Sequence, residues 1–169
     1  MPKKPEILSP VGHWPELEAA IHSGADAVYF GLTHFSARAK VGFTLAELGE
    51  VMQELHRNRV RGYVTYNTLV FDSELKEAAR GLAGIADAGA DAILVQDWAV
   101  VKMAREIAPW LDIYGSTQMS VTNAAGVRAA HALGCSRVVL ARELSLDEIR
   151  KIHQETHGDV ACEIGRAHV

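Results

Sequence analysis

Short runs of β-branched and aromatic residues alternate along this chain with longer stretches in which apolar residues recur every three or four positions. Strict alternation of the two patterns is typical of repeated βα units around a parallel sheet. The predicted strands cover residues 6–9, 27–31, 62–66, 92–95, 112–115, 137–140 and 159–163. Because parallel neighbours need crossover connections, seven strands with a helix between each pair leave few folds open.

The helices between these strands have recognisable ends. Thr44 with Glu47, and Ser145 with Glu148, have the spacing of capping boxes and predict two helix starts. Helix ends are predicted where Gly or Asn tolerates a left-handed conformation or where Pro stops a helix. These positions are Gly24, Asn58, Gly89, Pro109, Gly134 and Gly158. Six ends predict six helices.

The same αβ turn is used repeatedly. Residues 24–28 read GADAV, residues 89–93 read GADAI, and residues 134–138 have a similar outline. Together with the absence of a linker, this favours an α/β fold of the (βα)8 TIM type, truncated after about seven strands, over an open doubly wound sheet. Periodicity alone does not separate the two, but neither G-x-G-x-x-G nor a P-loop sequence follows any strand. We therefore predict an incomplete TIM-type barrel over residues 1–163.

Composition excludes several classes of protein. No run of about eighteen uncharged apolar residues is present, which argues against a membrane-spanning helix and a membrane partner. The amino terminus lacks a secretory pattern, and Cys135 and Cys162 have no CxxC spacing, so we expect a cytoplasmic protein without a disulfide framework or metal site. A net charge of −4 argues against broad electrostatic binding of nucleic acid by this segment, but leaves a local basic patch open.

Polar residues gather where the predicted strands end. In a barrel these carboxyl ends form the catalytic mouth, so we predict a polar substrate site there. Its candidate residues are Arg38, Asn67, Gln96, Asp97, Ser116, Gln118, Arg142 and Glu143. Structural roles remain alternatives: Asp97 suits a helix N-cap, Asn67 suits a turn, and Arg142 with Glu143 suits a rim ion pair.

The catalytic residues cannot be assigned from spacing. Arg38 suits two-point binding of a carboxylate or phosphate, whereas Lys40 is more typical of a solvated loop. His13 and His34, both near strand ends, are the two histidines suited to proton transfer. The chain has no G-x-S-x-G or H-E-x-x-H motif, so neither a serine hydrolase nor a zincin is supported.

Several phrases, in order, resemble the collagenase-like peptidases, peptidase family U32, a family of unknown mechanism. They are residues 10–12 (PVG), 24–31 (GADAVYFG), 35–40 (FSARAK), 66–70 (YNTLV), 95–97 (VQD), 116–119 (STQM), 122–123 (TN) and 139–145 (VLARELS). The resemblance extends to about Glu163. It implies a barrel-type catalytic domain and hydrolysis of peptide bonds, with this chain as a fragment of the enzyme.

The resemblance also implies a second activity. Relatives hydroxylate tRNA or rRNA bases, or a quinone precursor, without oxygen, using an iron–sulfur cluster and, for RNA, prephenate. Their cluster cysteines follow a Val-His-Gly-type phrase, which this chain lacks after Cys162 and Glu163. We therefore expect no cofactor in this segment and a possible iron–sulfur cluster in the missing carboxyl-terminal part. Residues 164–169 resemble a translated sequencing adapter and are expected to be a non-native tail.

Three functions thus remain open: a peptidase, a redox hydroxylase, and a non-catalytic barrel that binds a partner chain. The expected substrate is a peptide or an RNA, and both homo- and hetero-oligomers stay open. We expect residues 1–163 to have no activity alone.

Overall fold

The computed structural model describes residues 6–156 and 160–161. Within them, seven strands form one parallel sheet in the order β1-β2-β3-β4-β5-β6-β7. The strands are β1 (Leu8–Val11), β2 (Ala27–Gly31), β3 (Arg61–Tyr66), β4 (Ala92–Val95), β5 (Asp112–Gly115), β6 (Arg137–Val139) and β7 (Val160–Ala161). The α-helices are α1 (Trp14–His22), α2 (Leu48–Arg57), α3 (Leu75–Asp87), α4 (Trp98–Ile107), α5 (Ala124–Leu133) and α6 (Leu146–Thr156). Two 3₁₀ turns, η1 (Asp72–Glu74) and η2 (Thr117–Met119), follow β3 and β5.

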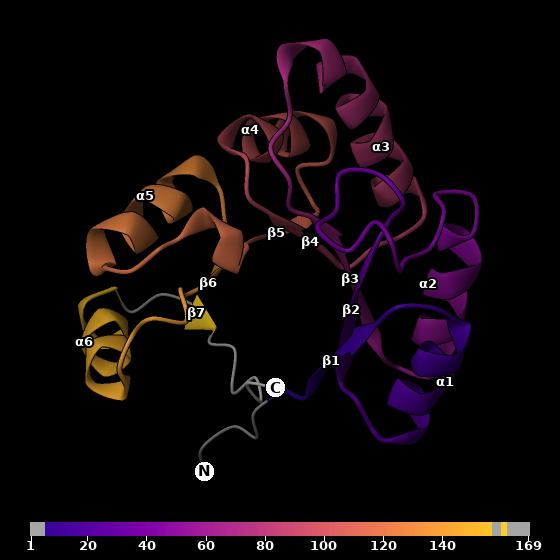
Figure 1. Cartoon of the computed structure of the whole chain (residues 1–169), viewed down its shortest axis with the longest axis horizontal. Coiled ribbons are helices and arrows are strands. Elements are labelled where there is room, and N and C mark those ends of the chain that lie inside the picture. Colours follow the sequence, from indigo (N-terminus) through magenta and orange to yellow (C-terminus); the bar gives the residue numbers. More distant parts are fainter. Residues whose placement is uncertain (1–5, 157–159, 162–169) are drawn as a thin grey trace.

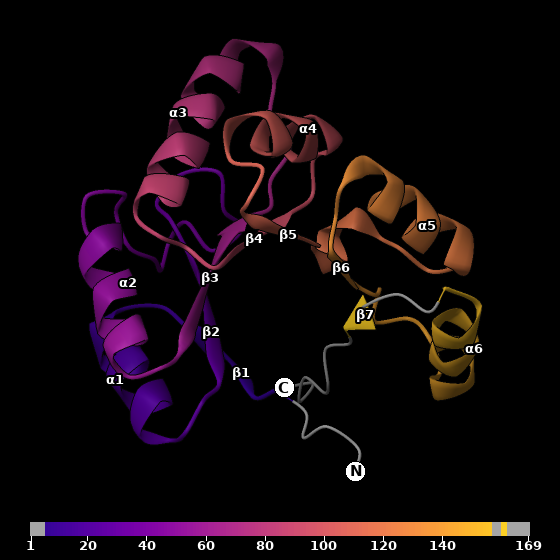
Figure 2. The ribbon, with the colours of Figure 1, turned by 180° about the vertical axis from the view of Figure 1, so that it is seen from behind.

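The sheet curls around a common centre, with its helices on the outer side (Figures 1 and 2). Each strand pairs with the next one along the chain, so the order never reverses as it would in a doubly wound sheet. The predicted TIM-type α/β arrangement is confirmed, and seven of its parallel strands lie within the described residues.

Strand bounds differ from the prediction mainly at the first strand. The predicted strand 6–9 is wrong by two residues, since β1 runs from Leu8 to Val11 and pairs with β2 in that register. Pro10 lies within β1, where its missing N–H is tolerated because β1 is at the edge of the described sheet. Of the predicted strand 159–163, only Val160 and Ala161 lie within the described residues. The predicted tail 164–169 and the helix end at Gly158 lie outside them.

The two faces of the sheet are packed differently. On the outer face, alternate strand residues such as Val64, Ile93 and Ile113 join the main core with residues of the helices, and all three are fully buried. The inner face holds a smaller cluster of Ala27, Tyr63, Ala92, Leu94 and Tyr114, with Tyr29 packed against it. This alternation follows from the two-residue period of a strand.

The repeated αβ turn relies on glycine. Gly24, Gly89 and Gly134 have φ angles of 78°, 79° and 116°, a region in which only glycine is unstrained. The prediction that Asn58 takes this conformation is wrong: its φ is −92°, and Arg59 is left-handed instead, with a φ of 59°.

Both predicted capping boxes form. Thr44 N donates to Glu47 Oε2 over 2.8 Å, and Ser145 N donates to Glu148 Oε2 over 2.7 Å. The Ser145 box begins α6 directly, whereas the Thr44 box closes a turn just before α2. Among the described helices, none is both long enough and apolar enough to cross a bilayer.

Candidate functional site

The β2–α2 loop folds inward over the end of β2. A Cβ atom on Gly31 would lie 2.5 Å from Ser36 Oγ and 2.8 Å from Arg38 Cβ, so the close approach requires glycine. Ser36 Oγ accepts from Arg38 N (3.1 Å) and lies 2.6 Å from Thr65 Oγ1, which donates to the carbonyl of Phe30 (3.1 Å). This buried chain of hydrogen bonds, the relay of Ser36 and Thr65, holds the loop against β2 and β3.

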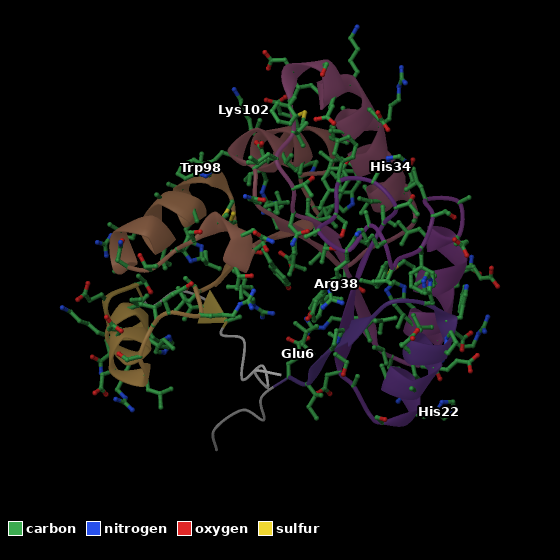
Figure 3. The ribbon with its side chains drawn as sticks, in the orientation of Figure 1. Glu6, His22, His34, Arg38, Trp98 and Lys102 are labelled. Atoms are coloured by element: carbon green, nitrogen blue, oxygen red, sulfur yellow. The ribbon has the colours of Figure 1, made fainter. Side chains whose placement is uncertain are left out.

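The loop places Arg38 on the inner side of the sheet, where Figure 3 shows it. Its Nη2 donates to Tyr29 Oη over 3.1 Å, and its guanidinium carbon lies 4.7 Å from the centre of the Tyr29 ring. No carboxylate in residues 6–156 or 160–161 forms an ion pair with Arg38. A half-buried guanidinium of this kind is suited to a carboxylate or phosphate of a ligand.

Asn67 connects this loop to β5. Its Oδ1 accepts from Ala37 N over 3.1 Å, and its Nδ2 donates to Ser116 Oγ over 3.3 Å. Ser116 Oγ also accepts from Gln118 N, which caps η2. Asn67 is therefore a bridge between two segments at the mouth.

Gln96 and Asp97, which both follow β4, are placed differently. Asp97 Oδ1 accepts from Ala99 N (2.8 Å) at the start of α4, and Oδ2 accepts from Val70 N (3.1 Å). Both carboxylate oxygens are thus bound to backbone, and the N-cap alternative for Asp97 is the one realised. Gln96 is half-buried, and its amide has no hydrogen-bond partner among the described residues, which leaves it available for a ligand.

The remaining predicted site residues lie at the rim. Gln118 is exposed on η2, and Arg142 and Glu143 are exposed on the turn between β6 and α6. The parallel order places all eight predicted residues at one end of the sheet, but hydrogen bonds within the described chain join only Asn67, Ser116 and the backbone of Gln118.

Neither of two hollows in the described structure is lined by Asn67, Gln96, Gln118 or Arg142. One hollow of about 150 Å³ lies outside the sheet beside His34 and Tyr66. A second, of about 130 Å³, lies between the start of α4 and α5. The predicted site residues line neither hollow. They lie instead at the open end of the sheet formed by the carboxyl ends of the strands.

The two histidines predicted for proton transfer lie apart from Arg38 and Asn67. His13 is exposed and forms the N-cap of α1. His34 Nδ1 is 4.0 Å from Glu77 Oε1, at a surface where the two side chains are 75% and 62% exposed. Lys40 is exposed, as expected of a solvated loop residue.

A second polar network, at the amino ends of the strands, was not predicted. Glu6 accepts from Tyr63 Oη (2.6 Å), from Arg61 and, through Oε2, from Arg137 Nη1 (3.4 Å). Burial, and then the hydrogen bond to Glu6, raise the pKa of Tyr63 well above its usual value. Its members are up to 131 residues apart in the sequence, so no local motif signals them.

The described cysteine does not suit an iron–sulfur cluster. Cys135 is buried, and burial raises the pKa of its thiol to about 11, whereas cluster ligands are several clustered thiolates. Within the described part of the chain, no three His, Cys, Asp or Glu side chains are close enough together to hold a metal ion. Cys162 lies outside the described residues.

The fold defines a parallel α/β barrel protein in which polar side chains gather at the carboxyl ends of the strands. The sequence model of peptidase family U32 matches residues 12–165. The chain belongs to this family, as its sequence phrases indicated.

Named relatives fall into two groups. A Helicobacter pylori protein named tRNA hydroxylation protein P is 39% identical over 149 residues, which cover 87% of this chain and 35% of that protein. An Escherichia coli 23S rRNA 5-hydroxycytidine synthase is 36% identical over 155 residues, or 92% of this chain and 23% of that protein. A Porphyromonas gingivalis protein named collagenase is 34% identical over 159 residues, or 93% and 38% of the two chains. The chain thus spans between 23% and 38% of the length of these three relatives.

Solved structures support the fold. A U32 peptidase superimposes with a TM-score of 0.76 at 11% identity, over 96% of this chain and 69% of that one. A thiamine phosphate pyrophosphorylase from Pyrococcus furiosus superimposes with a TM-score of 0.66 at 19% identity, over 95% and 75% of the two chains.

Proposed function

We propose that the full-length protein hydroxylates a base of tRNA or rRNA, and that this chain supplies the barrel face that holds the substrate. The observation that carries the proposal is the alignment of nearly the whole chain with relatives named for tRNA and 23S rRNA hydroxylation, at 36–39% identity. An RNA substrate would also agree with the expected cytoplasmic location.

The chemistry of the mouth supports this reading. Arg38 offers a cation without a carboxylate partner in the described chain, and Gln96 offers a free amide. A guanidinium suits a substrate phosphate or the carboxylate of a co-reactant, and an amide suits the edge of a base. We propose that an iron–sulfur cluster, which would supply the redox chemistry, is held by residues outside those described.

Peptide hydrolysis is the second candidate, because a relative of comparable identity is named collagenase. The described residues give it less support. Ser116 Oγ accepts hydrogen bonds from Asn67 and from Gln118 N, and no histidine in the described chain is hydrogen-bonded to it. The raised pKa of Cys135, about 11, keeps that buried thiol protonated at neutral pH.

The test is deletion of the gene in its host, followed by mass spectrometry of nucleosides from tRNA and rRNA. We expect loss of a nucleoside one oxygen atom heavier than its parent, and its return when the full-length gene is restored. An unchanged nucleoside profile, together with release of peptides from denatured collagen by the purified full-length protein, would instead establish the peptidase.

A further inference from the structure

The region from α4 to β6 differs in charge from the rest of the chain. Residues 113–142 contain no aspartate or glutamate, and residues 98–142 contain five Lys or Arg against two carboxylates, although the whole chain has a net charge of −4. Three of the five, Lys102, Arg128 and Arg142, are exposed. Neither Lys102 nor Arg128 forms an ion pair with a carboxylate in the described chain. A local excess of exposed cations attracts a polyanion.

An aromatic ring is exposed within the same region. Trp98, in the first turn of α4, is 58% exposed, and Lys102 lies one turn later on the same helix. Residues four apart lie on one face of a helix, and Figure 3 shows both side chains at the outer edge of the molecule. A single exposed apolar residue is ordinary on a protein surface, so the exposure of Trp98 alone does not indicate a binding site. The residues beside the ring provide that evidence.

Trp98 forms one wall of the hollow of about 130 Å³ between α4 and α5. Ser120, Thr122 and Asn123 supply polar groups to it, and Met119 and Val121 supply apolar surface. Asn123 Oδ1 accepts from Gly126 N, but its amide hydrogens have no acceptor in the described chain. The hollow therefore combines an aromatic face with hydroxyl and amide groups.

The hollow lies next to the mouth. Trp98 follows Gln96 by two residues at the end of β4, and the carbonyl of Val121 accepts from Ala141 N (3.0 Å), directly before Arg142. The hollow and the mouth therefore lie at the same end of the sheet.

We infer that this surface binds single-stranded RNA beside the base to be modified, with one unpaired base stacked on Trp98 and the adjoining phosphate near Lys102. The inference rests on the proposed function. Proteins that read unpaired RNA stack its bases on aromatic side chains and bind its backbone with Lys and Arg. Ser120, Thr122 and Asn123 would contact the edge of the stacked base.

The binding test uses the full-length protein and a fluorescent single-stranded oligoribonucleotide, with fluorescence anisotropy as the readout. Trp98→Ala should weaken binding about tenfold or more, whereas Trp98→Phe, which keeps a stacking ring, should lose less. Trp110→Ala is the matched control, because Trp110 is 74% exposed but lies between α4 and β5, at the opposite end of the sheet. It should leave the affinity unchanged, and a duplex of the same sequence should show no dependence on Trp98.

Lys102 is tested by salt dependence. Lys102→Gln should lower the slope of log affinity against log salt concentration by about 0.7, the value for one phosphate of a single strand. Lys151→Gln, at a residue 3.9 Å from Glu155 on α6, should not. Thermal unfolding of each variant confirms that the fold is retained.

Equal affinities of wild type and a folded Trp98→Ala variant would overturn the inference, as would equal losses in the Trp98 and Trp110 variants. A Trp98-dependent affinity for denatured-collagen peptides but not for RNA would overturn it as well. The proposed function fails separately. If Trp98→Ala restores full nucleoside hydroxylation in the deletion strain, the RNA surface is wrong and the function stands; if deletion leaves every nucleoside unchanged, the function is wrong whatever the anisotropy shows.

Discussion

Asn67 Nδ2 donates to Ser116 Oγ over 3.3 Å and so joins the ends of β3 and β5 across the end of β4. Since Asn67 also accepts from Ala37 N, one side chain holds two walls of the mouth. Loss of a typical hydrogen bond reduces stability by only about 1 kcal/mol. The larger effect is therefore expected on substrate binding.

We predict that Asn67→Ala in the full-length protein lowers the proposed RNA hydroxylation activity severalfold while reducing the free energy of unfolding by only about 1–2 kcal/mol. Nucleoside mass spectrometry and urea unfolding measure the two effects. Asn58→Ala is the control, because within the described residues the Asn58 amide bonds only to Glu54, on the surface of α2. Similar activity losses in both variants would contradict the bridging role.

Arg38 should determine affinity for an anionic substrate group. Arg38→Gln is expected to raise KM by about one to two orders of magnitude, since a hydrogen bond to a charged group contributes about 1.5–3 kcal/mol. Arg38→Lys keeps the charge but loses two-point geometry, so its KM should lie between those of Arg38→Gln and wild type. Arg57→Gln, at a 70% exposed position paired with Glu54, is the control. An unchanged KM in Arg38→Gln would exclude anion binding at this residue.

The relay of Ser36 and Thr65 should stabilise the inward fold of the loop. Ser36→Ala leaves the Arg38 amide without its acceptor, so we expect a loss of about 1–3 kcal/mol in the free energy of unfolding. In a double-mutant cycle with Thr65→Val, the two losses should be non-additive, because the hydroxyl oxygens are 2.6 Å apart. Additive losses would show that the two hydroxyls act independently.

Much of the fold could be predicted because its signals are local. Gly24, Gly89 and Gly134 end helices in a conformation that only glycine adopts freely, and each is followed by a strand. The turn is repeated, and no nucleotide-binding motif indicates a doubly wound sheet with reversed strand order. Together these features suggest parallel strands in sequential order. The first strand was misplaced by two residues: β1 begins at Leu8, and Glu6, which precedes it, accepts hydrogen bonds from Arg61 and Tyr63, a role that no local pattern signals.

The site could be predicted only in outline. Parallel strands bring their carboxyl ends together, so the position of the mouth follows from strand assignment alone. The role of each side chain depends on contacts between distant segments, such as Arg38 with Tyr29 and Ser36 with Thr65. Asp97 shows the ambiguity: the same residue is a reasonable ligand for substrate and a good N-cap, and only its two backbone contacts decide.

Alkaline pH should destabilise the barrel partly through Tyr63. Burial and the bond to Glu6 raise the pKa of Tyr63 in the folded state, so the folded state favours the neutral phenol. The stability from this preference is fully present below the unfolded pKa of about 10 and is lost as the pH rises above it. Tyr63→Phe should be less stable at neutral pH but lose less stability between about pH 9 and 11, as measured by urea unfolding. Parallel curves for the two proteins would contradict this.

Acid should destabilise the protein through its capping boxes, whereas alkaline pH destabilises it through Tyr63. The hydrogen bonds from Ser145 lower the pKa of Glu148 in the folded state. The stability from this carboxylate is present above its unfolded pKa of about 4.5 and is lost as the pH falls through the lowered folded value. Glu148→Gln should therefore flatten the acid side of the stability curve. Glu18→Gln, at an exposed helix position outside a capping box, is the comparison variant, and an equal flattening in it would contradict the role of the capping box.

The contacts of Glu6 affect the order in which parts of the chain fold during synthesis. Arg61 and Tyr63 leave the ribosome soon after it, but Arg137 follows 131 residues later. The carboxylate therefore remains without its most distant partner until β6 has been synthesised and has curled round to meet it. Closure of this end of the molecule is expected to be among the last steps of folding, since contacts over such sequence distances form slowly.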